Sequence, residues 1–455
     1  RMQNHIKGGP SLFTDVDGRY RGLDREIHTA EADKPMYTIF SLWDTFRALH
    51  PLLTIIEPEL NTRFINALLK QYRDGGILPM WELAGNYTGT MIGYNAVPVI
   101  VDAYMKGDRG FDARLALEAC LRSAEYDTLA PIATTDYLKH AALMPISKYY
   151  KNTLGYVPCD KEHEAVAKGL EYAYDDWTIY HTALLAGNRS VADTYKKRAA
   201  NYTNVFDTNM GYARPRYADG RWKENFNLLN THGEGFIEGN ALNYSFYVPQ
   251  DVDNMIRLMG GDKSFVSKLD SLFTMHLPAE FFAQTEDVTE EGLLGGYVHG
   301  NEPSHHIPFL YAWTSQPWKT QYWQREIMNK MYRNNIDGLC GNDDCGQMSA
   351  WYILSSMGFY PVCPGTDQYV LGAPYLPYIK VMLENGKTFE VKADKVSDKN
   401  RYVKSVKLNG KPYTKGFITQ QDIMDGGTLT FEMTSSPNKK RVFNGTDRPY
   451  SLSSN

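Results

Sequence analysis

The sequence has few cysteines, no long apolar run and no block of basic residues. Five of its 455 residues are cysteine, none in a C-x-x-C pair, and so sparse a set does not make a disulfide framework. Cys340 and Cys345 flank a pair of aspartates and could form one bridge, although the odd total leaves at least one thiol free. No run of about eighteen apolar residues occurs, so the sequence predicts no membrane-spanning helix, and it shows no secretory signal peptide.

The charge balance narrows the choice of partners. The formal net charge is −5, and basic residues never form a run of the length that binds nucleic acid. We therefore expect neither nucleic acid nor a membrane surface as a partner, and a neutral or cationic ligand instead. The 32 tyrosines and 8 tryptophans exceed what a core needs and are typical of sugar-binding clefts. The alternative is that many of these tyrosines only cover helix surfaces.

The hydrophobic pattern predicts a mainly α protein with a small all-β domain at its C-terminal end. Apolar residues recur at helical spacing through blocks such as "FSLWDTFRALHPLLTII" and "HEAVAKGLEYAYDDWTIYHTALLAG", and "SVADTYKK" has Ser190 where a helix N-cap is expected. Later segments, such as "YIKVMLENGKTFEVKAD", alternate and are punctuated by Asn-Gly, which favours hairpins. We expect a helical domain over 1–363 and a β domain over 364–455. A succession of helix hairpins could close into a toroid whose concave end holds a site.

Carboxylates beside glycines mark the polar loops between the predicted helices. Cleavage of a glycosidic bond needs two such groups, one to protonate the leaving oxygen and one to attack or to activate water. Glu234 or Glu238 of "GEGFIEGN" could be the acid, and Asp343 or Asp344 of "GNDDCGQ" the base. The alternative is structural: Glu238 caps a helix, and the Asp pair accepts from the first amides of the helix "QMSAWYILSSM".

The same loops also offer ligands for a cation. Calcium binds carboxylate and amide oxygens, which this sequence offers at Asn240, Asn301, Glu302 and Asp344. Zinc is a weaker interpretation. The histidines of "HGNEPSHH" lack the H-E-x-x-H spacing that sets two imidazoles on one helix face.

Seven ordered motifs give the chain a close resemblance to the alpha-mannosidases of glycoside hydrolase family 92. They are "DVDGRYRG", "YTIFSLWDTFRALHPL", "WELAGNYTGTMIGYNAVPVIVDAYMKG", "LEYAYDDW", "FIEGNALNYSFYVPQDV", "GGYVHGNEPSHHIPFLYAW" and "GNDDCGQMSAWYILSSMGFYPVCPG". The resemblance implies a calcium-dependent, inverting exo-alpha-mannosidase on an (α/α)6 toroid, bacterial and either periplasmic or secreted. It also implies an N-terminal β-sandwich domain that helps to close the site. The chain contains no such domain and opens in mid-pattern with "RMQNHIKGGPSLF", so we expect an upstream part.

The resemblance also assigns site residues. Glu238 corresponds to the general acid and Asp344 to the general base, with Asp343 in a supporting or capping role. The residues expected to contact substrate are Trp43, Asp44, Arg47, Trp81, Glu82, Asn86, Glu302, His305 and His306. The expected calcium ligands are Asn240, Glu302 and Asp344. Asn95, Leu242 and Asn243 depart from the residues common in the family at positions expected to touch sugar.

Together these features predict hydrolysis of terminal alpha-mannosyl residues from glycans, with alpha-1,2 linkages expected first. Two other functions stay open. One is a different (α/α)6 glycoside hydrolase, such as an alpha-glucosidase or a trehalase-like enzyme. The other is a non-catalytic, calcium-dependent glycan-binding fragment, and loss of the N-terminal domain could also leave the chain inactive. The sequence fixes neither the linkage nor the oligomeric state.

Overall fold

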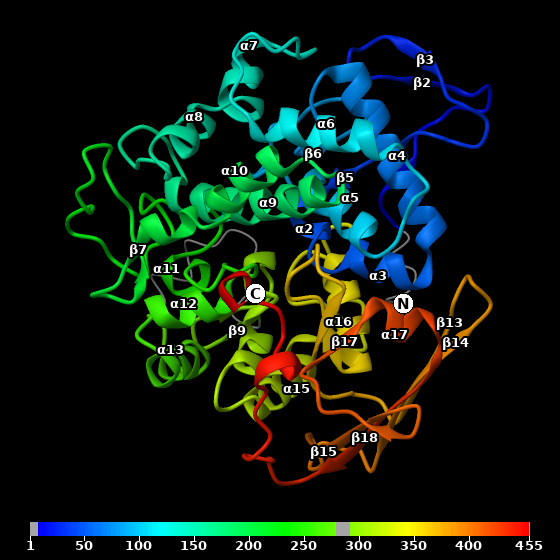
Figure 1. Ribbon diagram of the computed structural model, residues 1–455, viewed down its shortest axis with the longest axis vertical. Coiled ribbons are helices and arrows are strands. Elements are labelled where there is room, and N and C mark those ends of the chain that lie inside the picture. The colour runs from blue at the N-terminus through cyan, green and yellow to red at the C-terminus, as the bar shows by residue number, and fades with distance from the viewer. Residues whose placement is uncertain (1–7, 279–291, 455) are drawn as a thin grey trace.

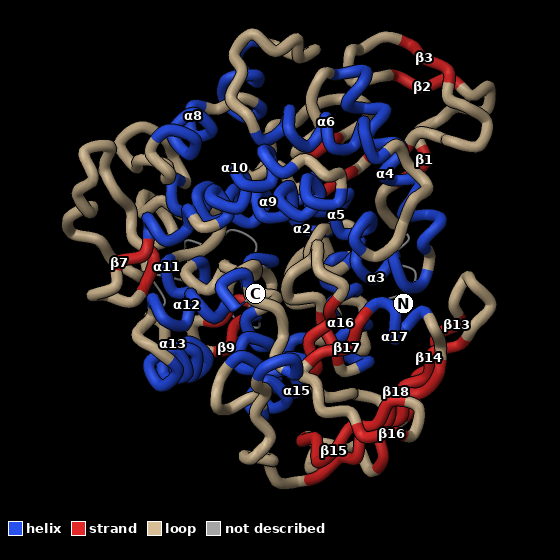
Figure 2. Tube along the Cα trace, in the orientation of Figure 1, coloured by secondary structure: helices blue, strands red, loops and turns tan. Residues whose placement is uncertain are grey.

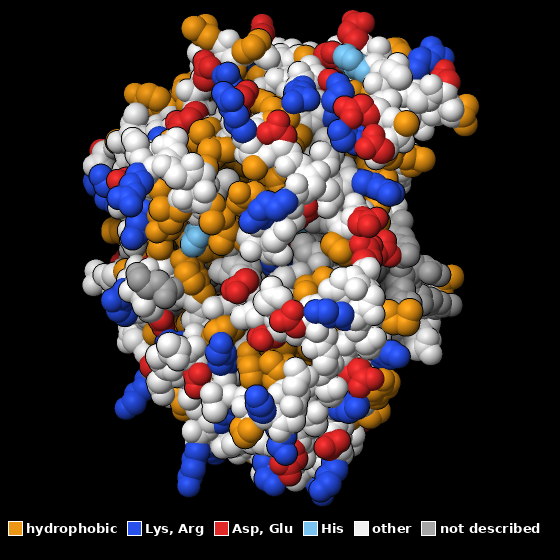
Figure 3. Space-filling model, turned by 45° about the vertical axis from the view of Figure 1, so that its right-hand side comes forward, with side chains coloured by type: hydrophobic (Ala, Val, Ile, Leu, Met, Phe, Trp, Pro, Cys, Tyr) orange, Lys and Arg blue, Asp and Glu red, His pale blue; other side chains and the backbone are white. Residues whose placement is uncertain are grey.

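The computed structural model describes residues 8–278 and 292–454, which form a helix-rich body and a strand-rich C-terminal region (Figures 1 and 2). The helices fill most of the view in Figure 2, and the longest strands gather at its lower right. No helix within the described ranges is long and apolar enough to cross a membrane. On the face drawn in Figure 3, acidic and basic side chains are interspersed.

The helices of the body follow the predicted apolar blocks. The α-helices are α2 (Leu42–Thr45), α3 (Leu49–Ile56), α4 (Pro58–Gly75), α5 (Ala96–Met105), α6 (Ala113–Ala124), α7 (Asp136–Leu138), α8 (Ile146–Thr153), α9 (Ala165–Leu185), α10 (Arg189–Ala199), α11 (Ala241–Tyr244), α12 (Val252–Leu258), α13 (Asp262–Thr274), α15 (Trp318–Met331), α16 (Gln347–Met357) and α17 (Gln420–Met424). Short 3₁₀ helices are η2 (Asn201–Val205), η4 (Glu302–Ser304), η5 (Ile307–Trp313), η6 (Gly445–Asp447) and η7 (Leu452–Ser454), and η1 (Lys139–Leu143) is a π-helix.

Helix α9 runs through the core of the body. It packs against α5, α6, α8 and α10, and most of its side chains are buried, as expected of a helix surrounded by others. Three of its buried groups are carboxylates, Glu171, Asp175 and Asp176. A carboxylate at such a depth requires polar partners, which the neighbouring helices supply.

Side-chain caps set where two of the helices begin. Asp112 accepts hydrogen bonds from the backbone N–H groups of Arg114 and Leu115, at the start of α6. The N-cap expected at Ser190 is wrong: Asn188 caps α10 by accepting from the N–H of Val191. Asn188 precedes Ser190 and is an equally good acceptor, so the helix starts two residues earlier than the serine suggested.

The C-terminal strands form two sheets. The larger has the order β13-β14-β18-β15-β16, with β14 and β18 parallel and the other pairs antiparallel. Its strands are β13 (Tyr378–Met382), β14 (Thr388–Asp394), β15 (Tyr402–Leu408), β16 (Lys411–Pro412) and β18 (Gly427–Thr434). The smaller sheet contains β11 (Phe359–Tyr360), β12 (Gln368–Leu371) and β17 (Phe417–Thr419). The expected boundary at residue 364 therefore falls between two strands that pair.

Five two-stranded ladders decorate the helical body. They are β1 (Ser11–Leu12) with β4 (Tyr37–Thr38), β2 (Arg19–Arg21) with β3 (Ile27–Thr29), β5 (Phe40–Ser41) with β6 (Trp81–Glu82), β7 (Phe206–Asp207) with β8 (Tyr212–Ala213), and β9 (Leu293–Leu294) with β10 (Tyr297–Val298). The motif "DVDGRYRG" thus contains β2 of the β2–β3 hairpin.

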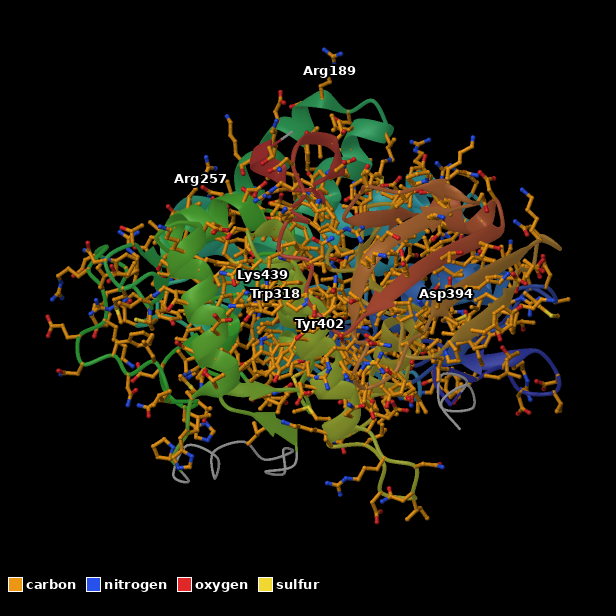
Figure 4. All side chains as sticks on the ribbon, turned by 90° about the horizontal axis from the view of Figure 1, so that it is seen from below. Arg189, Arg257, Trp318, Asp394, Tyr402 and Lys439 are labelled. Atoms are coloured by element: carbon orange, nitrogen blue, oxygen red, sulfur yellow. The ribbon has the colours of Figure 1, made fainter. Side chains whose placement is uncertain are left out.

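The two regions are held together by side chains and by the C-terminal tail. Trp318 of α15 meets Tyr402 of β15 edge to face, with ring centroids 6.1 Å apart, and the Nζ of Lys439 lies 5.8 Å from the Trp318 ring (Figure 4). Beyond the sheet the chain crosses back to the body (Figure 1). There the Tyr450 hydroxyl accepts from Trp177 Nε1 at 3.0 Å and the Ser451 hydroxyl donates to Asp251 at 2.8 Å.

Gly358 ends α16 with a φ of +86°, and a Cβ added there would lie 2.7 Å from the backbone N of Pro374. We expect Gly358→Ala to lower the free energy of unfolding by about 3 kcal/mol or more, because it combines left-handed strain with a clash against backbone. Gly386→Ala is the matched control, since its φ is +80° in open space. It should cost about 1 to 2 kcal/mol in urea unfolding. Equal decreases in the free energy of unfolding for the two variants would show that the close approach of Gly358 to Pro374 does not contribute to the cost of the substitution.

Candidate active site

A cavity of about 310 Å³ brings together residues from five separate parts of the chain. Its lining comprises Ser41, Trp43, Asp44, Trp81, Leu83, Thr88, Thr90, Met91, Glu238, Gly300, Asn301, Glu302, Asn342 and Asp344. Two carboxylates of the predicted catalytic set, Glu238 and Asp344, are among them. The cavity is therefore the candidate active site.

Local structure explains how these side chains come to one place. The β5–β6 ladder pairs Ser41 with Trp81, which sets the start of α2 beside the 81–91 loop. On the opposite wall, the loops at Gly300 and Gly341 touch: a Cβ added to Gly341 would lie 2.8 Å from the carbonyl oxygen of Gly300. Backbone contact of this kind excludes any side chain at the crossing, and it holds the two loops at a fixed distance.

Three carboxylates gather at the cavity: Asp44, Glu302 and Asp344, each with an oxygen within 4.8 Å of the others. Burial, followed by the charge of Asp344, raises the pKa of Asp44 well above its usual range. Burial and the charges of Asp44 and Asp344 likewise raise the pKa of Glu302. Glu302 Oε1 and Asn301 Oδ1 are buried without a hydrogen-bond partner. Clustered anionic oxygens with unused lone pairs are a donor set that suits a hard cation.

The two aspartates of "GNDD" point in different directions. Asp343 Oδ1 accepts from the backbone N–H of Ser349 at 2.9 Å, and its Oδ2 accepts from the Ser349 hydroxyl at 3.1 Å. Asp343 thus binds the first turn of α16, where an acceptor is favoured. Asp344 has a φ of +45°, and its side chain lines the cavity. The structural alternative raised for the pair therefore describes Asp343.

Glu238 and Glu234, the two candidates for the acid, are also separated. Glu238 lines the cavity, and its backbone oxygen accepts from the amide of Asn301. Glu234 lies outside it and pairs with Lys223, whose Nζ is 2.7 Å from Glu234 Oε2. Glu238 is therefore the glutamate of this motif that faces the candidate substrate space. It does not cap a helix, because the N-cap of the following helix is Asn240.

Behind the cavity, Trp43 is held by two charged residues. Its Nε1 donates to Glu171 Oε1 at 2.9 Å, and its backbone oxygen accepts from Arg47 Nε at 3.0 Å. The Arg47 guanidinium lies 5.0 Å from the Trp43 ring and 3.9 Å from Glu171. Arg47, predicted to contact substrate, is thus buried behind Trp43 instead of lining the cavity. Sequence reasoning gave Glu171 no role, although the residue lies within the motif "LEYAYDDW".

Glu82 and Asn86, which are expected to contact substrate, do not line this cavity. Glu82 accepts hydrogen bonds from Thr38 Oγ1 and from the N–H groups of Ile39 and Gly85. The Asn86 amide donates to the carbonyl of Leu83 and to that of Ala84. Both side chains hold the loop whose neighbouring residue, Trp81, does line the cavity.

His305 and His306 likewise lie outside the cavity lining. His305 Nε2 is 3.0 Å from the His299 carbonyl, and its Nδ1 is 3.0 Å from Gln347 Nε2. His306 Nε2 lies 2.7 Å from the carbonyl of Phe246. Burial lowers the pKa of His305 to about 3 and that of His306 to about 4, so both rings are neutral and serve to hydrogen-bond neighbouring segments. These contacts leave no paired imidazoles for zinc among the three histidines of the motif.

Asn240, a predicted calcium ligand, caps α11 instead. Its Oδ1 accepts from the N–H groups of Leu242 and Asn243, so this oxygen already serves the helix. The third member of the carboxylate cluster, beside Glu302 and Asp344, is Asp44. The three departures from the family pattern also lie outside the cavity lining; the Asn95 amide, for example, donates to the backbone oxygen of Ile92. Cys340 and Cys345 are both free thiols, so the possible bridge is absent.

The residues matched by a family model decide the family. The glycosyl hydrolase family 92 catalytic domain matches residues 5–435. This chain belongs to glycosyl hydrolase family 92. The family expected from the seven motifs is thereby confirmed.

Solved family 92 structures resemble the chain over almost its whole length. A family GH92 alpha-mannosidase from Bacteroides thetaiotaomicron is 40% identical, with a TM-score of 0.89 over 99% of this chain and 57% of its own. That enzyme has also been solved in complex with mannoimidazole. A family GH92 inverting mannosidase from the same organism is 34% identical, with a TM-score of 0.87 over 99% of this chain and 61% of its own.

A curated relative shows the same partial coverage. An uncharacterized secreted glycosidase from Arthroderma benhamiae is 26% identical over 410 residues, which are 84% of this chain and 50% of that protein. The chain thus spans between half and about three-fifths of the length of the relatives that it matches.

Burial raises the pKa of Glu171 to about 7 from 4.5, and this shift has a measurable consequence for stability. Because the folded state keeps the proton that the unfolded chain loses, the free energy of unfolding should fall as pH rises from about 4.5 to about 7. Relative to Glu171→Gln, which has no such proton, the wild type should lose up to about 3 kcal/mol across that window and no more above it. Urea unfolding at several pH values measures the difference.

The control for this experiment is Glu224→Gln, whose carboxylate is exposed. This variant measures what the loss of an exposed carboxylate does to the free energy of unfolding under the same conditions. A difference between the wild type and Glu171→Gln that does not change with pH would contradict a raised pKa at Glu171.

Proposed function

We propose that this chain is the catalytic part of a calcium-dependent, inverting exo-alpha-mannosidase that removes terminal alpha-mannosyl residues from glycans. The observation that carries the proposal is the cavity that Glu238 lines together with a cluster of three carboxylates, the buried Asp44 and Glu302 and the half-buried Asp344. Membership of family 92 and the printed activities of its solved neighbours support it. An (α/α)6 arrangement of the helices is part of the same proposal.

Two carboxylates, the number that glycoside hydrolysis needs, line this cavity beside Asp44 and Glu302. We assign Glu238 as the general acid, which protonates the leaving oxygen, and Asp344 as the general base, which takes a proton from the attacking water. Glu238 stands on the segment before α11, and Asp344 stands before α16, so they approach the cavity from different elements. Asp343 supports its neighbour by fixing the start of α16.

Asp44, Glu302 and Asp344, with the amide oxygen of Asn301, would hold the calcium ion. The fit rests on the 4.8 Å grouping of the carboxylates and on the two buried oxygens without partners. When bound, calcium would supply positive charge that chelates vicinal sugar hydroxyls such as O2 and O3 of mannose. Trp81, which is half-buried and lines the cavity, offers an aromatic ring against which a pyranose packs.

The finer parts of the proposal come from the resemblance. We propose alpha-1,2-linked mannosides as the first substrates and a secreted or periplasmic bacterial enzyme, and the secreted glycosidase among the relatives supports secretion. An N-terminal β-sandwich domain would complete the site, in keeping with the greater length of the solved neighbours.

Calcium binding can be measured without turnover. Isothermal titration with calcium should give one site, which Glu302→Gln weakens by at least about tenfold, because the variant removes a charged ligand. Glu234→Gln is the matched control, a nearly buried glutamate outside the cavity, and it should bind calcium as the wild type does. A chelator should abolish mannoside hydrolysis and added calcium restore it. Full hydrolysis after exhaustive removal of calcium would refute the metal requirement.

The mechanism is tested by the first product and by the two aspartates. NMR of a panel of mannobioses, with glucobioses for comparison, should show beta-mannose appearing ahead of mutarotation. Asp344→Asn should abolish turnover on every substrate, because each one needs activated water. Asp343→Asn should keep measurable turnover and lose about 0.5 to 2 kcal/mol of stability, as expected for a weakened helix cap.

Several outcomes would overturn this assignment. Alpha-mannose as the first product would exclude inversion. An Asp343→Asn variant as inactive as Asp344→Asn would reassign the base. Release of glucose in place of mannose would favour another class of glycoside hydrolase, and sugar binding without any turnover would favour a binding fragment.

A further inference from the structure

A second and larger hollow, of about 1040 Å³, lies on the other side of the loop that carries the two aspartates. It is enclosed by the segment between α15 and α16 and by two tyrosines outside that segment, Tyr352 and Tyr375. We call this hollow, lined by residues of 332–343 with Met328, Tyr352 and Tyr375, the outer groove. The proposed mechanism does not use it.

Aromatic rings form one wall of the outer groove. The ring centroids of Tyr332 and Tyr352 are 4.8 Å apart, and those of Tyr352 and Tyr375 are 6.2 Å apart. Hydrogen bonds fix two of the rings: the Tyr332 hydroxyl donates to the Met348 carbonyl at 3.1 Å, and the Tyr375 hydroxyl donates to Asn329 at 2.8 Å. A row of fixed tyrosines is a wall on which sugar rings can pack at little cost in conformational entropy.

Polar side chains form the opposite side. Exposed residues between Arg333 and Asp337 include the amides of Asn334 and Asn335, and Asn342 and Asp343 close the groove toward α16. Amides both donate and accept, which matches the paired character of sugar hydroxyls. The single large apolar side chain at the tip, Ile336, is 90% exposed, so the groove is not a continuous apolar surface of the kind that protein partners cover.

The outer groove is adjacent to the catalytic cavity. Asn342 lines both of them, and the backbone contact of Gly300 with Gly341 is the wall between them. Gly300 faces the cavity and Gly341 faces the groove, so two backbone segments in direct contact separate the two spaces.

We propose that the outer groove binds further sugar units of an oligomannoside whose terminal residue occupies the catalytic cavity. The inference rests on the proposed function and extends it: the substrate class becomes oligosaccharides of three or more units, held on both sides of the 341–344 loop. The groove is large enough for more than one pyranose, and its fixed rings and flanking amides supply the two kinds of contact that sugars use.

Binding is tested in a background without turnover. In Glu238→Gln with calcium present, alpha-1,2-mannotetraose should bind at least about fivefold more tightly than alpha-1,2-mannobiose in isothermal titration, because it makes additional ring contacts. Adding Tyr375→Ala should lower the tetraose affinity by about fivefold and so remove most of this preference. Tyr375→Phe, which keeps the ring, should retain it.

A matched control and a second variant guard against misfolding. Tyr378→Ala removes a more exposed tyrosine on β13, outside the groove, and should leave the preference for tetraose unchanged. Asn334→Ala alters only an exposed loop side chain and should weaken tetraose binding by about threefold through a lost hydrogen bond. In the otherwise wild-type enzyme, the ratio of kcat/KM for tetraose to that for mannobiose should fall in the same order.

The outcomes distinguish the groove from the proposed function. Mannobiose and mannotetraose binding with equal affinity, both to the parent and to Tyr375→Ala, would overturn the groove proposal while leaving the cavity as a mannoside site. Binding of neither sugar would overturn the proposed function itself. A preference for tetraose that survives both Tyr375→Ala and Asn334→Ala would place the additional sugar units elsewhere and overturn the groove assignment.

Discussion

The repulsion among three carboxylates that share one buried space is the constraint around which this site is built. Asp44, Glu302 and Asp344 come from segments far apart in the sequence, and holding like charges within 4.8 Å of each other at a site shielded from water costs free energy unless a proton or a cation compensates. The surrounding structure keeps them together nevertheless. The β5–β6 ladder fixes α2, and the contact between Gly300 and Gly341 fixes the other two loops. A fold that holds three carboxylates so close together favours the binding of a proton or a cation between them.

Much of the fold could be predicted from the sequence because its elements carry local signals. Helical periodicity predicted α9 and α16 closely, and alternation with Asn-Gly turns predicted the hairpins of the C-terminal sheet. The misplaced cap at α10 shows the limit of such signals: Ser190 and Asn188 are both good N-caps, and nothing local to the sequence decides between them.

The site was only partly predictable, for a related reason. A short motif shows which carboxylates and amides are candidates for the site. Whether their oxygens face a ligand or accept from a nearby backbone N–H depends on the local backbone conformation, which the motif does not specify. The oxygens of Asn240 and Glu82 accept hydrogen bonds from backbone N–H groups, whereas Asp344 lines the cavity from a left-handed conformation. Glu171 could not be found at all, because its partner Trp43 lies 128 residues away and meets it only in the folded chain.

The C-terminal tail has a consequence for how the molecule is made. Tyr450 accepts a hydrogen bond from Trp177, which stands on the same helix as Glu171, and Ser451 binds Asp251 in the helical body. During synthesis the helical body emerges from the ribosome before Tyr450 and Ser451 do. Helix α9 therefore lacks its contact with the C-terminal tail while the C-terminal sheet is translated. The helical body that holds the site is therefore completed late in biosynthesis, once the C-terminal tail with Tyr450 and Ser451 has been made.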